Sequence, residues 1–348
     1  MLRRFDGVSV DGIIGASGTE LIDIALMCER LGYEPQKTRR FIKSLGFEQV
    51  RLLRRPQTVS DLAQAAVPPL LEALKLEPDS LDAFIFVTQS QDYIVPAPTY
   101  CLQQPLGLSE EVLMLDLVQG CTGFVYGLFY AATLLCSGVC NKVLVCAGDT
   151  SGYDGRQKGQ EANDLLFGDG LGAAVLSRRP DAAGLWFSLQ SHGALHDVII
   201  EPNGRSKYKR SLDYDQGHIE DTGTFIDGPR LADYVLNSGK ADVLRLLEAA
   251  GLKSTALSYC IAHQANKTLL KALAGLCALT PEQMPFLAAH TGNTSSASIP
   301  LSLSESSQSL PKLKEAPALL CSFGVGMAVA SALVDLRRTL ILPALYLD

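Results

Sequence analysis

The sequence predicts an α/β protein made of two similar halves, with sheets that are covered on both faces. Its 348 residues are more than one core usually organises, and they suit two packed halves. Helical patterns alternate with short apolar runs, as in sheets covered by helices. The same order of elements occurs twice along the chain, which indicates an internal duplication.

The first half contains two predicted helices and three predicted strands. The helices cover residues 60–76 and 122–137, and Gly138 ends the second one. Short apolar runs predict strands at residues 81–87, 111–118 and 142–147. Because these runs are apolar along most of their length, they are typical of strands buried on both faces.

The second half repeats this order. Helical patterns cover residues 233–250 and 294–309, and apolar runs predict strands at residues 257–262, 284–289, 318–322 and 327–333. Three segments of the first half align with three of the second: 74–82 with 250–258, 143–148 with 318–324, and 170–176 with 326–332. Their common order predicts an N-terminal half of residues 1–180 and a C-terminal half of residues 181–348.

Composition narrows the class of protein. Hydrophobic residues make up 47% and charged residues 19%, which indicates a globular chain with a large core. With 30 basic and 37 acidic residues, the net charge of −7 argues against nucleic-acid binding. No secretory signal follows Met1, and no stretch reaches the roughly 18 apolar residues of a membrane helix. Nine cysteines, an odd number, predict reduced thiols in a cytoplasmic protein.

Cys121 is the candidate nucleophile. It lies between a predicted strand and a predicted helix, and Gly120 and Gly123 beside it allow a tight turn and close approach of another backbone. Unpaired N–H groups and the dipole at a helix N-terminus favour a thiolate, so we expect a lowered thiol pKa. The alternative is a buried structural cysteine, which most of the nine must be.

Two polar residues of the second half are candidate partners of this cysteine. His263 follows a predicted strand, and open α/β sheets bind ligands at strand ends. Asn293 lies in a polar segment, where a turn or a helix cap is the alternative role. His290 is close to Asn293 in the sequence, and we expect it to be structural.

Two glycine-rich segments complete the pattern. Gly324 and Gly326 allow backbone N–H groups to face a reacting oxygen, although a simple turn is the alternative. Gly168 and Gly170 indicate a second tight turn, which we expect to be structural.

Together these motifs resemble the β-ketoacyl-acyl carrier protein synthase III family. The resemblance is carried by GCTGF at residues 120–124, FGDGLGAAVL at 167–176, HQAN at 263–266, GNTSSAS at 292–298 and FGVG at 323–326. Each motif alone is weak. All five occur in the family's order, within a resemblance that covers residues 81–333, and this combination is specific.

The resemblance implies a duplicated thiolase fold in five α-β-α-β-α layers, and a homodimer. It implies acyl transfer from an acyl-CoA or acyl-carrier protein to Cys121, then decarboxylative Claisen condensation with a malonyl-type thioester. Coenzyme A or phosphopantetheine is then part of the substrate, with no tightly bound cofactor. The resemblance assigns the oxyanion hole to the backbone N–H groups of Cys121 and Val325. It makes His263 and Asn293 the donors to the second thioester carbonyl.

The sequence departs from the family's pattern at the expected coenzyme A site. Family members place an N-terminal Trp and an Arg around the adenine, whereas the only Trp here is Trp186. Residues 37–46 contain no Trp, and residues 157–164 contain no Arg. Val325 replaces a common glycine, and residues 227–230 differ from the housekeeping type. These departures favour a carrier protein or an unusual acyl-CoA as donor, and a specialised biosynthetic role.

Basic residues provide a candidate docking surface for an acidic carrier protein. Arg39 and Arg40 belong to a basic N-terminal region, and Lys267 and Lys271 follow His263 at helical spacing. Solvated surface charge is the alternative for each of them.

Two other functions fit parts of the pattern. An acyltransferase of the same fold would pass the acyl group to an oxygen or nitrogen acceptor without loss of carbon dioxide. A non-catalytic subunit would only bind a paired synthase, although it would not need to keep the cysteine, the histidine and the asparagine. No metal site is expected, because Cys136 and Cys140 have no ligand-type residues nearby, and no nucleotide-binding fingerprint is present.

Overall fold

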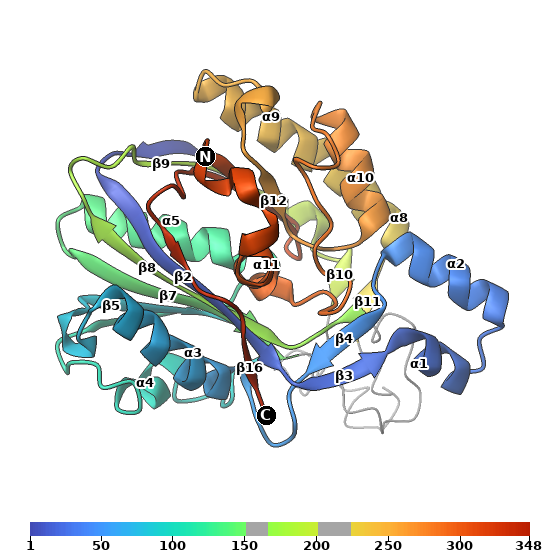
Figure 1. Ribbon diagram of the computed structural model, residues 1–348, viewed down its shortest axis with the longest axis horizontal. Coiled ribbons are helices and arrows are strands. Elements are labelled where there is room, and N and C mark those ends of the chain that lie inside the picture. The colour runs from blue at the N-terminus through green and yellow to red at the C-terminus, as the bar shows by residue number, and fades with distance from the viewer. Residues whose placement is uncertain (151–165, 201–223) are drawn as a thin grey trace.

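The computed structural model describes residues 1–150, 166–200 and 224–348, so residues 157–164, singled out above, lie outside the described part. Within it, two mixed sheets alternate with three layers of helices (Figure 1). No helix in these three ranges has the length and apolar character needed to cross a membrane.

The N-terminal sheet has seven strands in the order β15-β2-β8-β7-β5-β6, with β16 also paired to β2. β5 is parallel to β6 and β7, whereas β8 is antiparallel to both β7 and β2. The strands are β2 (Val8–Gly18), β5 (Ala83–Val87), β6 (Leu113–Leu117), β7 (Lys142–Asp149), β8 (Gly170–Arg178), β15 (Leu340–Ile341) and β16 (Leu345–Leu347).

The C-terminal sheet has five strands in the order β1-β9-β14-β13-β12. They are β1 (Leu2–Phe5), β9 (Leu185–Ser191), β12 (Cys260–Ala262), β13 (Ala318–Gly324) and β14 (Ala328–Val334). β12 is parallel to β13, and β14 is antiparallel to its two neighbours. The path β5-β7-β8-β2 of the first sheet is therefore repeated as β12-β13-β14-β9, which confirms the predicted duplication.

Helices separate and cover the two sheets (Figure 1). α5 (Gly123–Cys136) and α11 (Ser298–Ser306) lie between the sheets, α3 (Val59–Leu74) and α4 (Pro98–Gln103) cover the outer face of the N-terminal sheet, and α9 (Lys240–Ala249) and α10 (Lys267–Leu276) cover that of the C-terminal sheet. α8 (Gly228–Tyr234) leads through a π-helical turn into α9. The five α-β-α-β-α layers are those expected from the sequence.

A small extension projects from the first sheet and carries part of the candidate docking surface. It consists of β3 (Glu20–Asp23), α1 (Ile24–Arg30), α2 (Pro35–Leu45) and β4 (Gln49–Leu52), which share their own apolar cluster. Asp23 begins α1 by accepting a hydrogen bond from the N–H of Leu26 at 3.0 Å. Gly46 ends α2 in the left-handed conformation, with φ 86°. A separate two-stranded pair joins β10 (Ile199–Ile200) to β11 (Phe225–Ile226).

Alternation of side chains along the buried strands builds two separate cores from one sheet. In β5, Ala83, Ile85 and Val87 belong to the cluster between the sheets. Phe84 and Phe86 point to the opposite face and pack with α3 and α4. Because successive side chains of a strand point to opposite faces, a continuous apolar run is what a sheet covered on both faces requires.

The ends of the chain cross between the two sheets. β1 pairs with β9 in the C-terminal sheet, whereas β15 and β16 pair with β2 in the N-terminal sheet. The division of the chain between residues 180 and 181 stays a prediction. The terminal strands connect the two halves by backbone hydrogen bonds in both directions.

The strand predicted at residues 284–289 is not formed. This segment runs as an irregular connection, with Met284 in the apolar cluster under α10 and Ala288 in that of the small extension. Its backbone groups bond outside any sheet: the N–H of Leu287 donates to Oε1 of Gln264, and the carbonyl of Ala289 accepts from Glu48. The prediction was wrong because apolar residues here serve two cores at once and not one sheet.

Candidate active site

Cys121 lies in a tight turn between β6 and α5, as the sequence predicts. The N–H of Gly123 donates to the carbonyl of Gly120 at 2.6 Å. A Cβ atom on Gly120 would collide with Gln89 and lie 2.5 Å from Cγ1 of Val325, and one on Gly123 would lie 2.8 Å from a side chain of β5. Only glycine fits at these two positions, and the resulting turn holds Cys121 at the start of α5.

The turn between β13 and β14 packs directly against this cysteine. A Cβ atom on Gly324 would lie 2.7 Å from Sγ of Cys121. The backbone N–H groups of Val325 and of Cys121 itself lie close enough to the sulfur to lower the pKa of the thiol. Two backbone donors thus converge on a single atom, at the place for which the sequence suggests an oxyanion hole.

His263 follows β12 and is buried, with 2% of its surface exposed. Its Nδ1 lies 2.9 Å from Oγ of Ser298, and its ring packs edge-on against Phe323 with centroids 5.7 Å apart. The N–H of Gln264 donates to the same Ser298 oxygen at 3.0 Å, which leaves the hydroxyl hydrogen to donate to Nδ1. This arrangement favours the tautomer with its proton on Nε2.

Burial also decides the charge of this histidine. Loss of hydration lowers the pKa of His263 to about 4, and a hydrogen bond with the backbone of Ser295 opposes this shift only in part. The imidazole is therefore neutral at neutral pH, and a neutral ring can donate a proton from only one nitrogen.

Asn293 lies in the turn that leads into α11. Its N–H donates to the carbonyl of Leu166 at 2.8 Å, and its carbonyl accepts from the N–H of Gly168 at 3.1 Å, so the turn is fixed to the segment before β8. Its side-chain Oδ1 accepts a hydrogen bond from the N–H of Ser295 at 3.0 Å. Because this oxygen is occupied, the Nδ2 group is the part of the amide that can donate to a ligand.

Ser295 joins all three candidate residues. Its hydroxyl contacts the Cys121 thiol, its backbone contacts the His263 ring, and its N–H binds the Asn293 amide oxygen. The structure therefore brings Cys121, His263 and Asn293 together from three turns that are far apart in the sequence.

The thiol of Cys121 does not have the lowered pKa that its place at a helix N-terminus suggests. Burial raises its pKa to about 11, and the negative charge of Asp149 acts in the same direction. The N–H groups of Val325 and Cys121 and the hydroxyl of Ser295 lower the pKa without outweighing the lost hydration. The expectation was wrong because it considered the helix end without the packing of the surrounding turns.

Asp149 and Ser295 were not identified from the sequence. Asp149 is the last residue of β7 and is buried, with 8% of its surface exposed. The one available signal was a carboxylate at the end of an apolar strand, where α/β sheets form their sites.

The four candidate docking residues lie on two neighbouring helices. Arg39 and Arg40 are exposed on α2, and Lys267 and Lys271 are exposed on α10. The two helices meet where the hydroxyl of Thr268 donates to the carbonyl of Ser44 at 2.6 Å (Figure 1). None of the four basic residues forms an ion pair with another residue of the described ranges.

Trp186 does not lie near the small extension of α1 and α2. It belongs to β9, where the guanidinium of Arg4 lies 5.4 Å from its ring centroid. His290 is exposed and makes no hydrogen bond with another described residue. No cluster of three or more metal-ligating side chains occurs among residues 1–150, 166–200 and 224–348.

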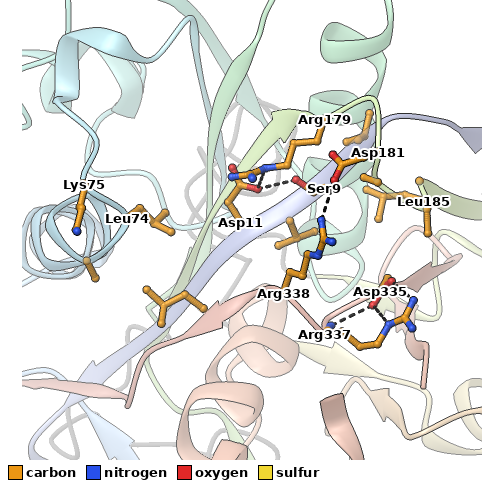
Figure 2. Close-up of a pocket in the computed structure, with 17 residues that line it drawn as sticks. Ser9, Asp11, Leu74, Lys75, Arg179, Asp181, Leu185, Asp335, Arg337 and Arg338 are labelled. Carbon is orange, nitrogen blue, oxygen red and sulfur yellow. Dashed lines mark hydrogen bonds and ion pairs between the residues drawn. The ribbon is translucent and has the colours of Figure 1, made fainter. Parts of the chain in front are cut away.

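A surface cavity of about 660 Å³ lies away from the cysteine, where β2, the end of α3 and the strand termini near residues 180 and 338 meet (Figure 2). Six of the seven charged side chains that line it form ion pairs: Arg179 with Asp11, Arg338 with Asp181, and Arg337 with Asp335. None of the candidate catalytic residues lines it.

The layered fold defines a class of protein, the condensing acyltransferases with the thiolase fold. The family model for the C-terminal part of 3-oxoacyl-acyl-carrier-protein synthase III matches residues 247–336, and the model for synthase III itself matches residues 115–193. The chain is 30% identical to a Campylobacter jejuni protein provisionally named 3-oxoacyl-acyl-carrier-protein synthase 3, over 97% of this chain and 96% of that protein.

A solved structure and a second sequence relative give the same result. The 3-oxoacyl-acyl-carrier-protein synthase of Burkholderia xenovorans superimposes with a TM-score of 0.90 at 29% identity, covering 100% of this chain and 99% of that chain. The β-ketoacyl-acyl-carrier-protein synthase III of Methylococcus capsulatus is 29% identical over 84% of this chain and 88% of its own. The chain therefore belongs to the 3-oxoacyl-acyl-carrier-protein synthase III family and is an acyltransferase.

Proposed function

We propose that the protein catalyses a decarboxylative Claisen condensation through an acyl-Cys121 intermediate. The observation that carries this proposal is the convergence of two backbone N–H groups on the sulfur of Cys121, with the donors of His263 and Asn293 tied to it through Ser295. This arrangement has a nucleophile, an oxyanion hole and two hydrogen-bond donors within one small space.

In the first half-reaction, the Cys121 sulfur attacks the carbonyl carbon of a donor thioester. The carbonyl oxygen becomes an oxyanion that the N–H groups of Cys121 and Val325 stabilise, and the proton lost by the Cys121 thiol ends on the donor sulfur when it leaves. The intermediate collapses with release of the donor thiol and leaves an acyl-Cys121 thioester. The resting Cys121 thiol is protonated. It must therefore lose its proton when the donor thioester binds or reacts.

In the second half-reaction, a malonyl-type thioester loses carbon dioxide. Its thioester carbonyl accepts hydrogen bonds from Nε2 of His263 and from Nδ2 of Asn293, which stabilise the enolate that forms. The enolate carbon attacks the acyl-Cys121 carbonyl, the Cys121 sulfur leaves as a thiolate, and it takes up a proton from solvent. A neutral, buried His263 suits this role because it donates without carrying a charge.

The donor and the acceptor are proposed to arrive on carrier proteins or on coenzyme A. The adjacent basic faces of α2 and α10 would attract an acidic carrier protein to the side of the molecule that holds His263. Neither coenzyme A nor phosphopantetheine is expected to stay bound after the reaction. The Val325 side chain, packed on Gly120, narrows the space beside the sulfur and supports a specialised acyl substrate.

The protein is further proposed to act as a homodimer, in the cytoplasm. β6 is an edge strand of the N-terminal sheet, and apolar side chains near it are exposed: Ile94 (72%), Val95 (79%), Tyr100 (62%) and Val118 (68%). Unpaired edges with apolar neighbours are usually covered by another chain. A second copy of the chain would pair with the edge strand β6 and cover the four exposed apolar side chains.

The proposal is tested by intact-protein mass spectrometry with a panel of acyl-CoAs and acyl-carrier proteins. We expect an acyl adduct on the wild type and none on Cys121→Ala, while Cys136→Ala, which removes an exposed cysteine, keeps the adduct. Addition of a malonyl-type thioester should then release the acyl group as a β-keto product together with carbon dioxide.

The two alternative functions give different results in the same experiment. Discharge of the adduct to an alcohol or amine without carbon dioxide would identify a simple acyltransferase. Failure of a folded wild type to form any adduct across the panel would contradict the proposed condensation and favour a non-catalytic subunit.

A further inference from the structure

Asp149 is a buried carboxylate beside the nucleophile, and none of the steps above uses it. Its Oδ1 accepts hydrogen bonds from the N–H of Gln89 at 2.7 Å and the hydroxyl of Thr88 at 3.2 Å. Its Oδ2 accepts from the hydroxyl of Ser296 at 2.8 Å and from the N–H of Ser296 at 3.4 Å. Both oxygens are thus occupied by donors from two different turns.

Each of these turns reaches the catalytic cysteine. Gln89 follows β5, and its side chain packs against Gly120, the residue before Cys121. Ser296 follows Ser295, the residue that contacts Cys121, His263 and Asn293. Asp149 therefore connects the segment before Cys121 to the turn that carries Asn293 and contacts His263.

Ser295 provides a direct route from the carboxylate to the sulfur. Its hydroxyl lies close enough to the Asp149 carboxylate and to the Cys121 thiol to lower the pKa of each, and its single hydrogen can be donated to either group. Ser295 has a φ of 48°, a conformation that non-glycine residues rarely adopt, and the surrounding contacts must hold it. The hydrogen bonds from Asp149 to the adjacent Ser296 are such contacts.

Resting on the proposed function of Cys121, we propose that Asp149 is a positioning residue for this nucleophile. It holds the Ser295–Ser296 turn in place and, through the Ser295 hydroxyl and its own negative charge, controls the reactivity of the sulfur. The carboxylate favours a protonated, unreactive thiol in the resting enzyme.

Few charged groups act on the Cys121 thiol. In the described ranges, Asp149 is the one charged group whose field raises the pKa of Cys121, and the other titratable group of the site, His263, is neutral above about pH 4. From β13–β14 a backbone N–H faces Cys121, and after β5 the uncharged Gln89 faces the neighbouring Gly120. Burial raises the pKa of Asp149 itself, and a difference between the Cys121 profiles of the wild type and of a variant that lacks this carboxylate can be assigned to Asp149.

The test is the rate of alkylation of Cys121 by iodoacetamide over a range of pH, followed by peptide mass spectrometry. Asp149→Asn keeps the shape of the side chain and removes its charge. The Ser296 hydroxyl can rotate and accept a hydrogen bond from the new amide group. Without the charge, we expect the Cys121 profile to shift to lower pH by at least about half a unit. Ser295→Ala removes a donor to the sulfur, and its profile should shift to higher pH.

Two controls separate this effect from a general loss of structure. Cys136 is exposed and reports on bulk reactivity in the same samples, so its profile should stay unchanged. Asp242→Asn alters another fully buried aspartate, one bound by Ser188 and Gln190 in the C-terminal half, and should leave the Cys121 profile as in the wild type.

Coincident Cys121 profiles for the wild type and a folded Asp149→Asn protein would overturn the proposal. If Asp149→Asn does not fold, an unchanged profile for Ser295→Ala would overturn it instead. Alkylation needs no acyl donor or acceptor, so a failure of the proposed condensation would leave this result intact, and the two failures can be told apart.

Discussion

Gly324 lies against Cys121 so closely that a methyl group on its Cα would lie 2.7 Å from the sulfur. The two residues belong to different halves of the chain and to different layers of the fold. Any side chain at position 324 must displace either the nucleophile or the turn that carries the Val325 N–H.

Gly324→Ala is therefore expected to lower the rate of Cys121 acylation by about 10²-fold or more, because the sulfur loses its alignment with the N–H donors. Adduct formation followed by intact mass against time measures this rate. Gly275→Ala in α10, where no other atom lies within 4 Å of the new methyl, is the matched control. It should keep full acylation and raise the free energy of unfolding by roughly 0.4–1 kcal/mol. Equal acylation rates in the two variants would contradict the prediction.

Asn293→Asp is expected to separate the two half-reactions. A carboxylate cannot donate to the malonyl carbonyl, so condensation should fall by about 10²–10³-fold, whereas acylation of Cys121 should change little. Single-turnover assays of adduct formation and of β-keto product measure the two steps. Parallel losses in both steps would mean that Asn293 mainly holds the turn and does not act on the second substrate.

The buried His263 makes the free energy of unfolding depend on pH. Its folded-state pKa of about 4 lies below its ordinary value of 6.5, so the unfolded chain binds a proton first as the pH falls. The stability that depends on a neutral His263 is complete above pH 6.5 and is lost as the pH falls through about 4. This loss amounts to about 3 kcal/mol at most.

Urea unfolding of the wild type and His263→Gln at several pH values checks this expectation. The wild type should lose more free energy of unfolding than the variant over this acidic window, and the two should run parallel above it. Parallel curves at every pH would show that His263 does not cause the dependence.

Lys267→Glu combined with Lys271→Glu is expected to raise the KM for carrier-bound substrates several-fold and to leave that for pantetheine-bound analogues unchanged. The reason is lost attraction for an acidic partner, and the difference should shrink at high salt. Steady-state kinetics at two ionic strengths measure it. Lys75→Glu, an exposed lysine at the end of α3 on the opposite outer layer, is the control. A similar rise with Lys75→Glu would point to net charge instead of docking.

Val118→Asp is expected to weaken the dimer, because it adds a charge beside the exposed edge strand β6. Val139→Asp is the matched control, because it places the same charge at a valine of nearly equal exposure: Val139 is 67% exposed and Val118 is 68% exposed. Sedimentation velocity over a range of concentrations measures the dissociation. Identical behaviour of the two variants would argue against association through β6.

The sequence predicted the features that depend on neighbours along the chain. The apolar run of β5 and the Gly120–Gly123 turn follow from local chemistry, and both occur where expected. The thiol pKa of Cys121 could not be predicted, because it depends on burial by turns from other layers. Asp149 was missed for the same reason: its partners, Gln89 and Ser296, are brought together only by the folded sheets.

The crossing of the chain ends has a consequence for the order in which this protein can fold. β1 is synthesised well before β9 and has no strand partner until β9 has been made. β16 is synthesised long after β2, the strand with which it pairs. Neither sheet can therefore be completed from its own half during synthesis, and the N-terminal sheet closes only after β16 has been made. Shortening either end should damage the distant half first.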